Sequence, residues 1–216
     1  MRSARVALLL LTALCGTALC ACAHTPTDSP KLPPKELTVM NTSEADVANK
    51  LTLSAEEVGK RFLKLIAGLD SREDITPTRI QDVMGFPVSV APSALGAVVW
   101  STDLGGGWRY AFDYVPESPS LLRGVGLSFE HDTDRFSDMG AICSLDFDHY
   151  DSSLKSMGFV ASPTYGPIGQ LENWRYAKFA KGGSGGDILI SIIPQNVVAG
   201  SAGKVCVKSI STLNGR

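Results

Sequence analysis

Two stretches after residue 50 carry the apolar spacing of amphipathic helices. In the first, apolar residues recur three and four positions apart and share one helical face: Val58, Phe62, Leu65, Ile66 and Leu69. Ser54 and Glu57 have the spacing of a capping box and predict where this helix begins. The second stretch opens with Thr76 and Pro77, an N-cap followed by proline at the first helical position, and Gly85 is placed to end it.

The pattern then changes to the two-residue alternation that is typical of strands. Strands are predicted at residues 97–102, 108–115, 121–130, 171–179, 187–194 and 204–213. Residues 148–157 return to helical spacing, and Gly158 is placed to end that helix, whereas residues 143–147 are ambiguous. Together these elements predict an α+β fold in which helices pack on an antiparallel sheet.

A short internal similarity divides the chain into halves at residues 51–140 and 141–216. Met84-Gly85-Phe86 and Met157-Gly158-Phe159 each end a predicted helix, and each precedes a Trp-Arg-Tyr-Ala strand segment. Two tandem helix-plus-hairpin units would explain this, and chance is the alternative because the spacing differs by seven residues. The layout loosely resembles tandem inhibitor folds such as that of the β-lactamase inhibitory protein, which by itself implies no function.

The first 22 residues resemble the signal of a bacterial lipoprotein. Two early arginines precede a short apolar core, and Leu19-Cys20-Ala21-Cys22 then resembles a lipobox. The resemblance implies a signal peptide over residues 1–21 and a lipid on Cys22; ordinary signal cleavage with soluble release and a buried N-terminal helix are the alternatives. Ala23, where aspartate would favour inner-membrane retention, implies export. We therefore expect a lipid-anchored protein in the cell envelope, on the periplasmic face of the outer membrane.

Residues 22–50 are rich in proline and polar residues and show no apolar periodicity, so they predict a flexible tether before a single domain at 51–216. The chain has 20 basic and 22 acidic residues, and Arg2 and Arg5 leave with the leader, which gives the rest a net charge of −4. Without a basic cluster, a nucleic-acid partner is not expected. No later apolar stretch reaches the length of about 20 residues that a membrane span needs.

The cysteines sort by position. Cys15 and Cys20 lie in the leader and Cys22 is the lipid site, so Cys143 and Cys206 remain as a pair in an oxidising compartment. We predict a disulfide between these two residues. Two buried free thiols are the alternative.

Two groups of residues are candidates for binding a partner. Alternation places Trp108 and Tyr110 on one strand face, together with Phe112 and Tyr114, and Trp174 and Tyr176 match them in the second half. This aromatic stripe is either core or an exposed platform, because Trp and Tyr are frequent in binding hot spots. The second group, Glu130, Asp132 and Asp134, begins a polar loop at residues 131–140. It is either a solvated acidic loop or an edge that attracts a basic partner.

No catalytic or metal-binding set is predicted. Gly182-Gly183-Ser184-Gly185-Gly186 has the letters of a nucleophile elbow, but a strand follows it where the elbow requires a helix. His149 is the histidine placed to act as a base, and nothing marks its serine partner. The acidic loop lacks the glycine and the final glutamate of a calcium-binding EF-hand loop. We expect no enzyme, no metal and no cofactor.

The sequence therefore predicts a non-catalytic protein-binding lipoprotein. The most specific hypothesis is an inhibitor or immunity protein against a toxin or hydrolase in the periplasm. The alternative is a structural or assembly lipoprotein that binds envelope proteins or peptidoglycan. A hydrolase with a site built from scattered Asp, Glu and Ser residues is the third hypothesis.

Overall fold

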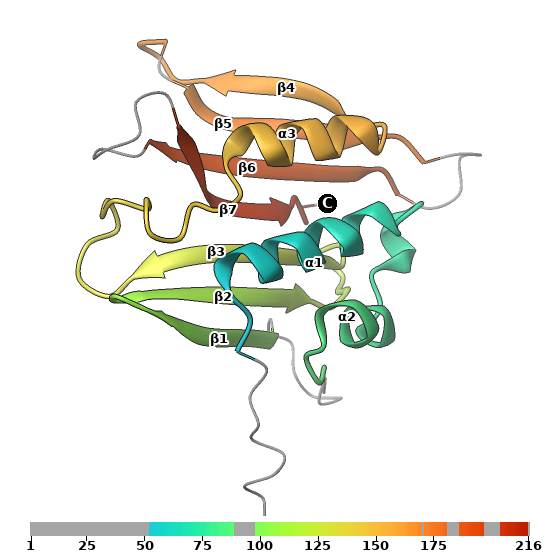
Figure 1. Cartoon of the computed structure of the whole chain (residues 1–216). Helices are drawn as coiled ribbons and strands as arrows, with labels where there is room; N and C mark the ends of the chain where they lie inside the picture. Colours follow the sequence, from blue (N-terminus) through green and yellow to red (C-terminus); the bar gives the residue numbers. More distant parts are fainter. Residues whose placement is uncertain (1–51, 89–97, 170, 181–185, 197–203, 216) are drawn as a thin grey trace, which may run out of the picture. The chain divides into compact units, whose positions relative to one another are not determined.

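The computed structural model describes residues 52–88, 98–169, 171–180, 186–196 and 204–215, all of which belong to one compact unit (Figure 1). The helical elements are α1 (Ala55–Ala67), η1 (Arg72–Asp74), α2 (Pro77–Met84) and α3 (Phe147–Ser156). The strands are β1 (Val98–Gly105), β2 (Trp108–Val115), β3 (Gly124–His131), β4 (Val160–Tyr165), β5 (Leu171–Lys178), β6 (Ile188–Asn196) and β7 (Val205–Thr212).

Local capping determines where the helices begin and end. The Ser54 side chain accepts a hydrogen bond of 3.1 Å from the backbone N–H of Glu57, which satisfies one of the free donors at the start of α1. Thr76 caps α2 in the same way, and Gly85 ends it with a left-handed φ of 81°. The first two helices are therefore confirmed, with the caps that the sequence indicates.

The strands form one antiparallel sheet in the order β1-β2-β3-β7-β6-β5-β4. In the first half of the chain a helical segment precedes the meander β1–β3, and in the second half α3 precedes the meander β4–β7. The two meanders join where β3 pairs with β7, with Leu127 opposite Ile210. The predicted α+β fold with helices on an antiparallel sheet is confirmed.

The core lies between one face of the sheet and the helices, which cross in front of the strands in Figure 1. Phe62, Leu65 and Ile66 of α1 and Leu154 of α3 are fully buried, because their apolar stripes face the sheet. Burial of this apolar surface is the main force that holds helices and sheet together.

One strand was missed by the sequence prediction. β4 contains Pro163, which cannot donate to a strand ladder and so weakens the strand pattern. The structure accommodates the proline because β4 is the last strand of the sheet and pairs only with β5, where Pro163 lies opposite Trp174. The third predicted strand begins at Gly124 rather than at residue 121, and Leu121 forms only an isolated bridge to Gly215.

Arg72 connects the two halves from within the protein. Its buried guanidinium donates to the carbonyl oxygen of Arg123 before β3, to that of Asp187 before β6 and to that of Leu213 after β7. It also donates to the side chain of Asn214. Four acceptors from segments far apart in the sequence therefore meet at one cation.

Candidate functional site

The aromatic stripe belongs to the core. Trp108, Tyr110 and Tyr176 are buried against the helices, and Trp174 is partly buried against the same core and contacts Phe147. An exposed aromatic platform is therefore wrong for Trp108, Tyr110 and Tyr176, since buried rings cannot meet a partner. The alternation of the strand fixed which residues share a face, but not which face the helices cover.

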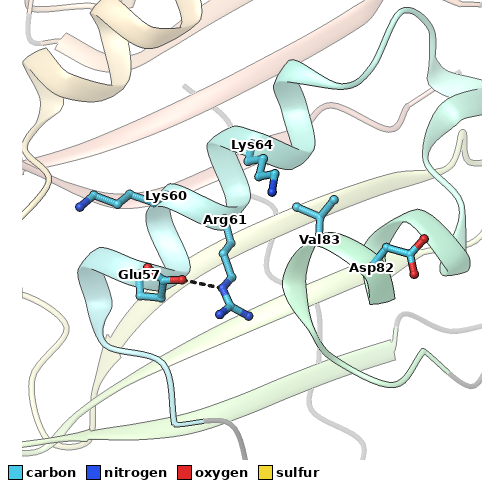
Figure 2. A pocket seen from close by; sticks show the side chains of 6 residues that line it. All are labelled: Glu57, Lys60, Arg61, Lys64, Asp82 and Val83. Carbon is cyan, nitrogen blue, oxygen red and sulfur yellow. Dashed lines mark hydrogen bonds and ion pairs between the residues drawn. The ribbon is translucent and has the colours of Figure 1, made fainter.

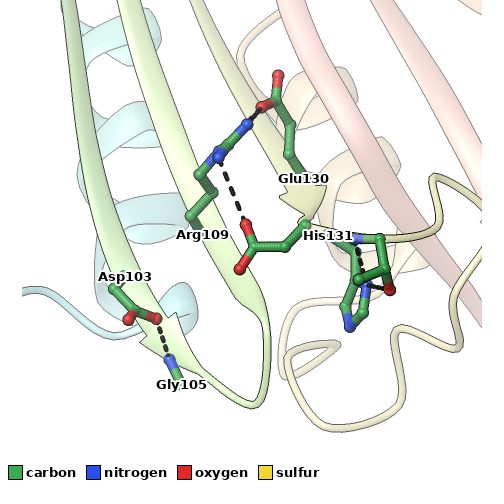
Figure 3. A network of polar contacts seen from close by, with 7 residues as sticks. Asp103, Gly105, Arg109, Glu130 and His131 are labelled. Carbon is green, nitrogen blue, oxygen red and sulfur yellow. Dashed lines mark hydrogen bonds and ion pairs between the residues drawn. The ribbon is translucent and has the colours of Figure 1, made fainter.

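The acidic residues Glu130, Asp132 and Asp134 lie where the sequence analysis expects them, at the end of β3 and in the loop that follows. Arg109 of β2 donates to the Glu130 carboxylate at 2.7 and 3.0 Å and reaches Asp132 at 3.4 Å. The Glu130 carboxylate raises the pKa of the Arg109 guanidinium. Figure 3 shows Arg109 and Glu130 on the side of the sheet away from the helices. Two of the three acidic side chains are thus paired with one arginine in an exposed network that keeps a net negative charge.

The segment between β3 and α3, residues 132–146, is called here the β3–α3 loop, and contacts along its length hold it to the domain. The predicted disulfide is present: Cys143 is bonded to Cys206 of β7, across 63 residues of sequence. Met139 is buried in the core, and Gln195 of β6 donates to the carbonyl oxygen of Ser137 at 2.6 Å. At the start of the loop, the Asp132 N–H donates to the carbonyl oxygen of Gly107.

The middle of the β3–α3 loop presents an aromatic ring to solvent. The Phe136 side chain is 65% exposed, and the guanidinium carbon of Arg135 lies 4.5 Å above the centre of its ring. The Asp134 carboxylate accepts a hydrogen bond of 2.8 Å from the Phe136 N–H, which fixes the local turn. Phe136 was missed by the sequence prediction, although one phenylalanine inside an otherwise polar loop is a signal that could have pointed to it.

Beside this loop lies a lysine without a hydrogen-bond partner among the described residues. The Lys208 ammonium is buried and lies 4.9 Å from the ring centre of Trp108, in the position of a cation–π contact. Burial lowers the pKa of Lys208, and the nearby carboxylates of Glu130 and Asp134 oppose that shift. The buried Trp108 ring therefore contacts this cation and does not form an exposed contact surface.

The histidines are not arranged for nucleophilic catalysis in the described part of the chain. His149 is exposed in the first turn of α3, and its ring contacts Tyr150. His131 packs edge-on against Trp108, and its Nδ1 lies 3.3 Å from the Thr133 hydroxyl. Ser184 lies outside the described residues. Within those residues no three His, Cys, Asp or Glu side chains are grouped as metal ligands would be.

A hollow of about 390 Å³ lies between α1 and α2 (Figure 2). Five of its six lining residues are charged, and Arg61 is already engaged by Glu57 at 2.7 Å and by the carbonyl oxygen of Met84. Sites for small molecules are mostly apolar with a few polar groups, so this hollow does not have their character.

No family model, curated protein or solved structure matches this chain. The likeness to tandem inhibitor folds therefore remains an analogy of layout. Among the described residues, no helix combines the length and the apolar character needed to cross a membrane. The lipobox with Cys22 and the tether lie outside the described residues.

Proposed function

We propose that this chain is a non-catalytic envelope lipoprotein whose domain binds another protein in the periplasm, most specifically as an inhibitor or immunity protein of a toxin or hydrolase. The observation that carries the proposal is the β3–α3 loop, which is anchored to the domain and exposes Phe136 and Arg135. The lipobox and the tether support a location in the cell envelope.

Anchoring matters because ordering a loop on binding costs free energy. The disulfide, the buried Met139 and the Gln195 hydrogen bond hold the β3–α3 loop to the sheet before any partner arrives. A loop that is already in its binding conformation loses less entropy on association. This suits a protein that acts by occlusion, because occlusion requires a rigid contact surface and no catalytic group.

The exposed side chains of the loop have the chemistry of a binding hot spot. Arginine and aromatic residues are enriched at the centres of protein interfaces, and here Arg135 and Phe136 are stacked on each other. Asp132, Asp134 and Asp138 lie close to them in the sequence of the same loop. Acidic groups around an apolar centre attract a basic partner and exclude acidic ones.

The test is affinity capture with matched phenylalanine variants. The tagged full chain is expressed with its leader, and bound envelope and secreted proteins are quantified by mass spectrometry for wild type, Phe136→Ala and Phe179→Ala. Phe179 is the control because it is 67% exposed but directly follows β5, away from the loop sequence. We expect a partner that Phe136→Ala loses and Phe179→Ala keeps.

The identity of that partner separates the hypotheses. Capture of a toxin or hydrolase would support an inhibitor or immunity protein. Capture of an envelope-assembly protein would instead support a structural or assembly lipoprotein. A partner that both variants retain equally well would remove the β3–α3 loop from the binding surface and with it the observation on which the proposal depends.

A further inference from the structure

The face of the sheet opposite the helices, called here the open face, is not covered by any described helix. Strand pairing places one row of residues straight across it, from β1 to β4: Val99, Asp113, Gly126, Ser211, Ser191, Arg175 and Ser162. Residues paired in this way project from the same side of a sheet. The row therefore shows which side chains lie next to one another across the open face.

Two opposite charges in this row have no hydrogen bond or ion pair to the described residues. The Asp113 carboxylate lies over Gly126, where a Cβ would come within 2.4 Å of Asp113 Oδ1. Burial removes water from the Asp113 carboxylate and raises its pKa. The Arg175 side chain is exposed on the other half of the sheet.

These two charges are placed symmetrically about the middle strand. β7 is the fourth of seven strands, and β2 and β5 each lie two strands from it. Consider a two-fold axis that runs parallel to β7 in the plane between two sheets. It places the open face of one copy on the open face of another, with β2 of each copy over β5 of the other. Because Asp113 and Arg175 share a row with Ser211 of β7, the rotation brings Asp113 of each copy opposite Arg175 of the other.

The same rotation places large side chains opposite small ones. Leu189 and Ile193 of β6 are 39% and 47% exposed on the open face. The operation puts β6 over β3, so that Ile193 meets the row of Ser128. A projecting side chain opposite a serine allows two sheets to approach closely.

The size of the face fits a stable interface. Seven strands about 4.8 Å apart are roughly 29 Å wide, and strands of eight residues are about 26 Å long. Two such faces in contact bury about 1,500 Å², within the range of specific protein–protein interfaces.

We propose that the open face binds a second copy of this chain, as a two-fold dimer with its axis along β7 and an Asp113–Arg175 pair on each side of that axis. The dimer goes beyond the proposed function and does not depend on it, because the residues that pair in the dimer lie on the strands of the open face, whereas Arg135 and Phe136 lie in the β3–α3 loop.

The position of Ser211 provides a geometric test. In the full chain, expressed with its leader and extracted in mild detergent, Ser211→Cys places two thiols at the axis. Facing sheets lie about 10 Å apart, too far for a direct disulfide, so a short reagent that reacts with one thiol at each end should join them. Ser162→Cys and Ser101→Cys are matched controls on the same face. Both serines are more exposed than Ser211 but lie three strands from the axis, so in the dimer their thiols are far apart. Wild type gives the background from the native cysteines.

We expect a cross-linked dimer from Ser211→Cys and only background from the two controls. Equal or better cross-linking at position 162 or 101 would indicate random collision and would overturn the proposal. A cross-link from position 211 to a different protein would overturn it as well, since another occupant would then cover the face.

The charges provide a second, independent test in the Ser211→Cys background. Arg175→Asp changes an exposed side chain, so the fold is retained, and it sets two carboxylates against each other on both sides of the axis. We expect the cross-linked fraction to fall about tenfold. Adding Asp113→Lys restores the opposite charges and should restore the cross-link. An unchanged fraction with Arg175→Asp would refute the pairing.

Discussion

Replacing Arg72 with methionine tests whether one buried cation connects the two halves of the sheet. Methionine keeps the apolar length of the side chain and removes all four hydrogen bonds, which leaves three backbone carbonyls without their donor. A hydrogen bond to a charged group contributes about 1.5–3 kcal/mol, and the cost of burying the guanidinium cancels part of the sum. We therefore expect a loss of about 3–5 kcal/mol in the free energy of unfolding.

The loss is measured by urea unfolding, followed by tryptophan fluorescence and by circular dichroism. Such a loss is a large part of the 5–15 kcal/mol that stabilises a typical domain, so the midpoint should shift far toward low urea. Arg109→Met is the matched control, because Arg109 makes its bonds on the exposed surface and should contribute little. If Arg72→Met is no less stable than Arg109→Met, Arg72 does not hold the halves together.

Two further predictions concern the disulfide and the buried tyrosines. Replacing Cys143 and Cys206 with serine opens a loop of 63 residues, and on the chain-entropy estimate this lowers the free energy of unfolding by about 4 kcal/mol, measured in urea against the oxidised wild type. Burial raises the pKa of Tyr150 and Tyr176 above the usual 10.0, and the Asp151 carboxylate that accepts from the Tyr176 hydroxyl adds to the shift. Since the folded state holds these protons more tightly than the unfolded chain, stability should fall as the pH rises above 10. Absorbance at 295 nm should show both phenols ionising only with unfolding; ionisation of all tyrosines in a folded protein near pH 10 would contradict this.

Local signals in the sequence predicted the local structure well. The N-cap residues Ser54 and Thr76 and the terminating glycines Gly85 and Gly158 work within a few residues of themselves, so their effect can be predicted without knowing the fold. Strand alternation likewise grouped the aromatic residues of β2 correctly. What alternation cannot supply is the identity of the layer that covers each face, and for that reason Trp108 and Tyr110 were candidates for a surface that they do not form.

Long-range contacts explain the remaining misses. The acceptors of Arg72 lie 51 to 142 residues away in the sequence, so no window of the chain could predict that this arginine is buried. β4 tolerates Pro163 only because it is an edge strand, which depends on the order of all seven strands. The binding role proposed for Phe136 rests on the anchoring of its loop by the disulfide and by Gln195, and these contacts could not be predicted from the sequence of the loop.

The two halves are similar but not equal, and the difference lies in β7. Met84-Gly85-Phe86 and Met157-Gly158-Phe159 both have a glycine with positive φ and a buried phenylalanine after it. Within the described residues the first meander has three strands and the second has four, so β7 is the strand without a counterpart. It pairs with both halves, its Cys206 anchors the β3–α3 loop, and its Ser211 lies at the middle of the open face. Both proposed surfaces therefore depend on the one strand that a simple duplication would not supply.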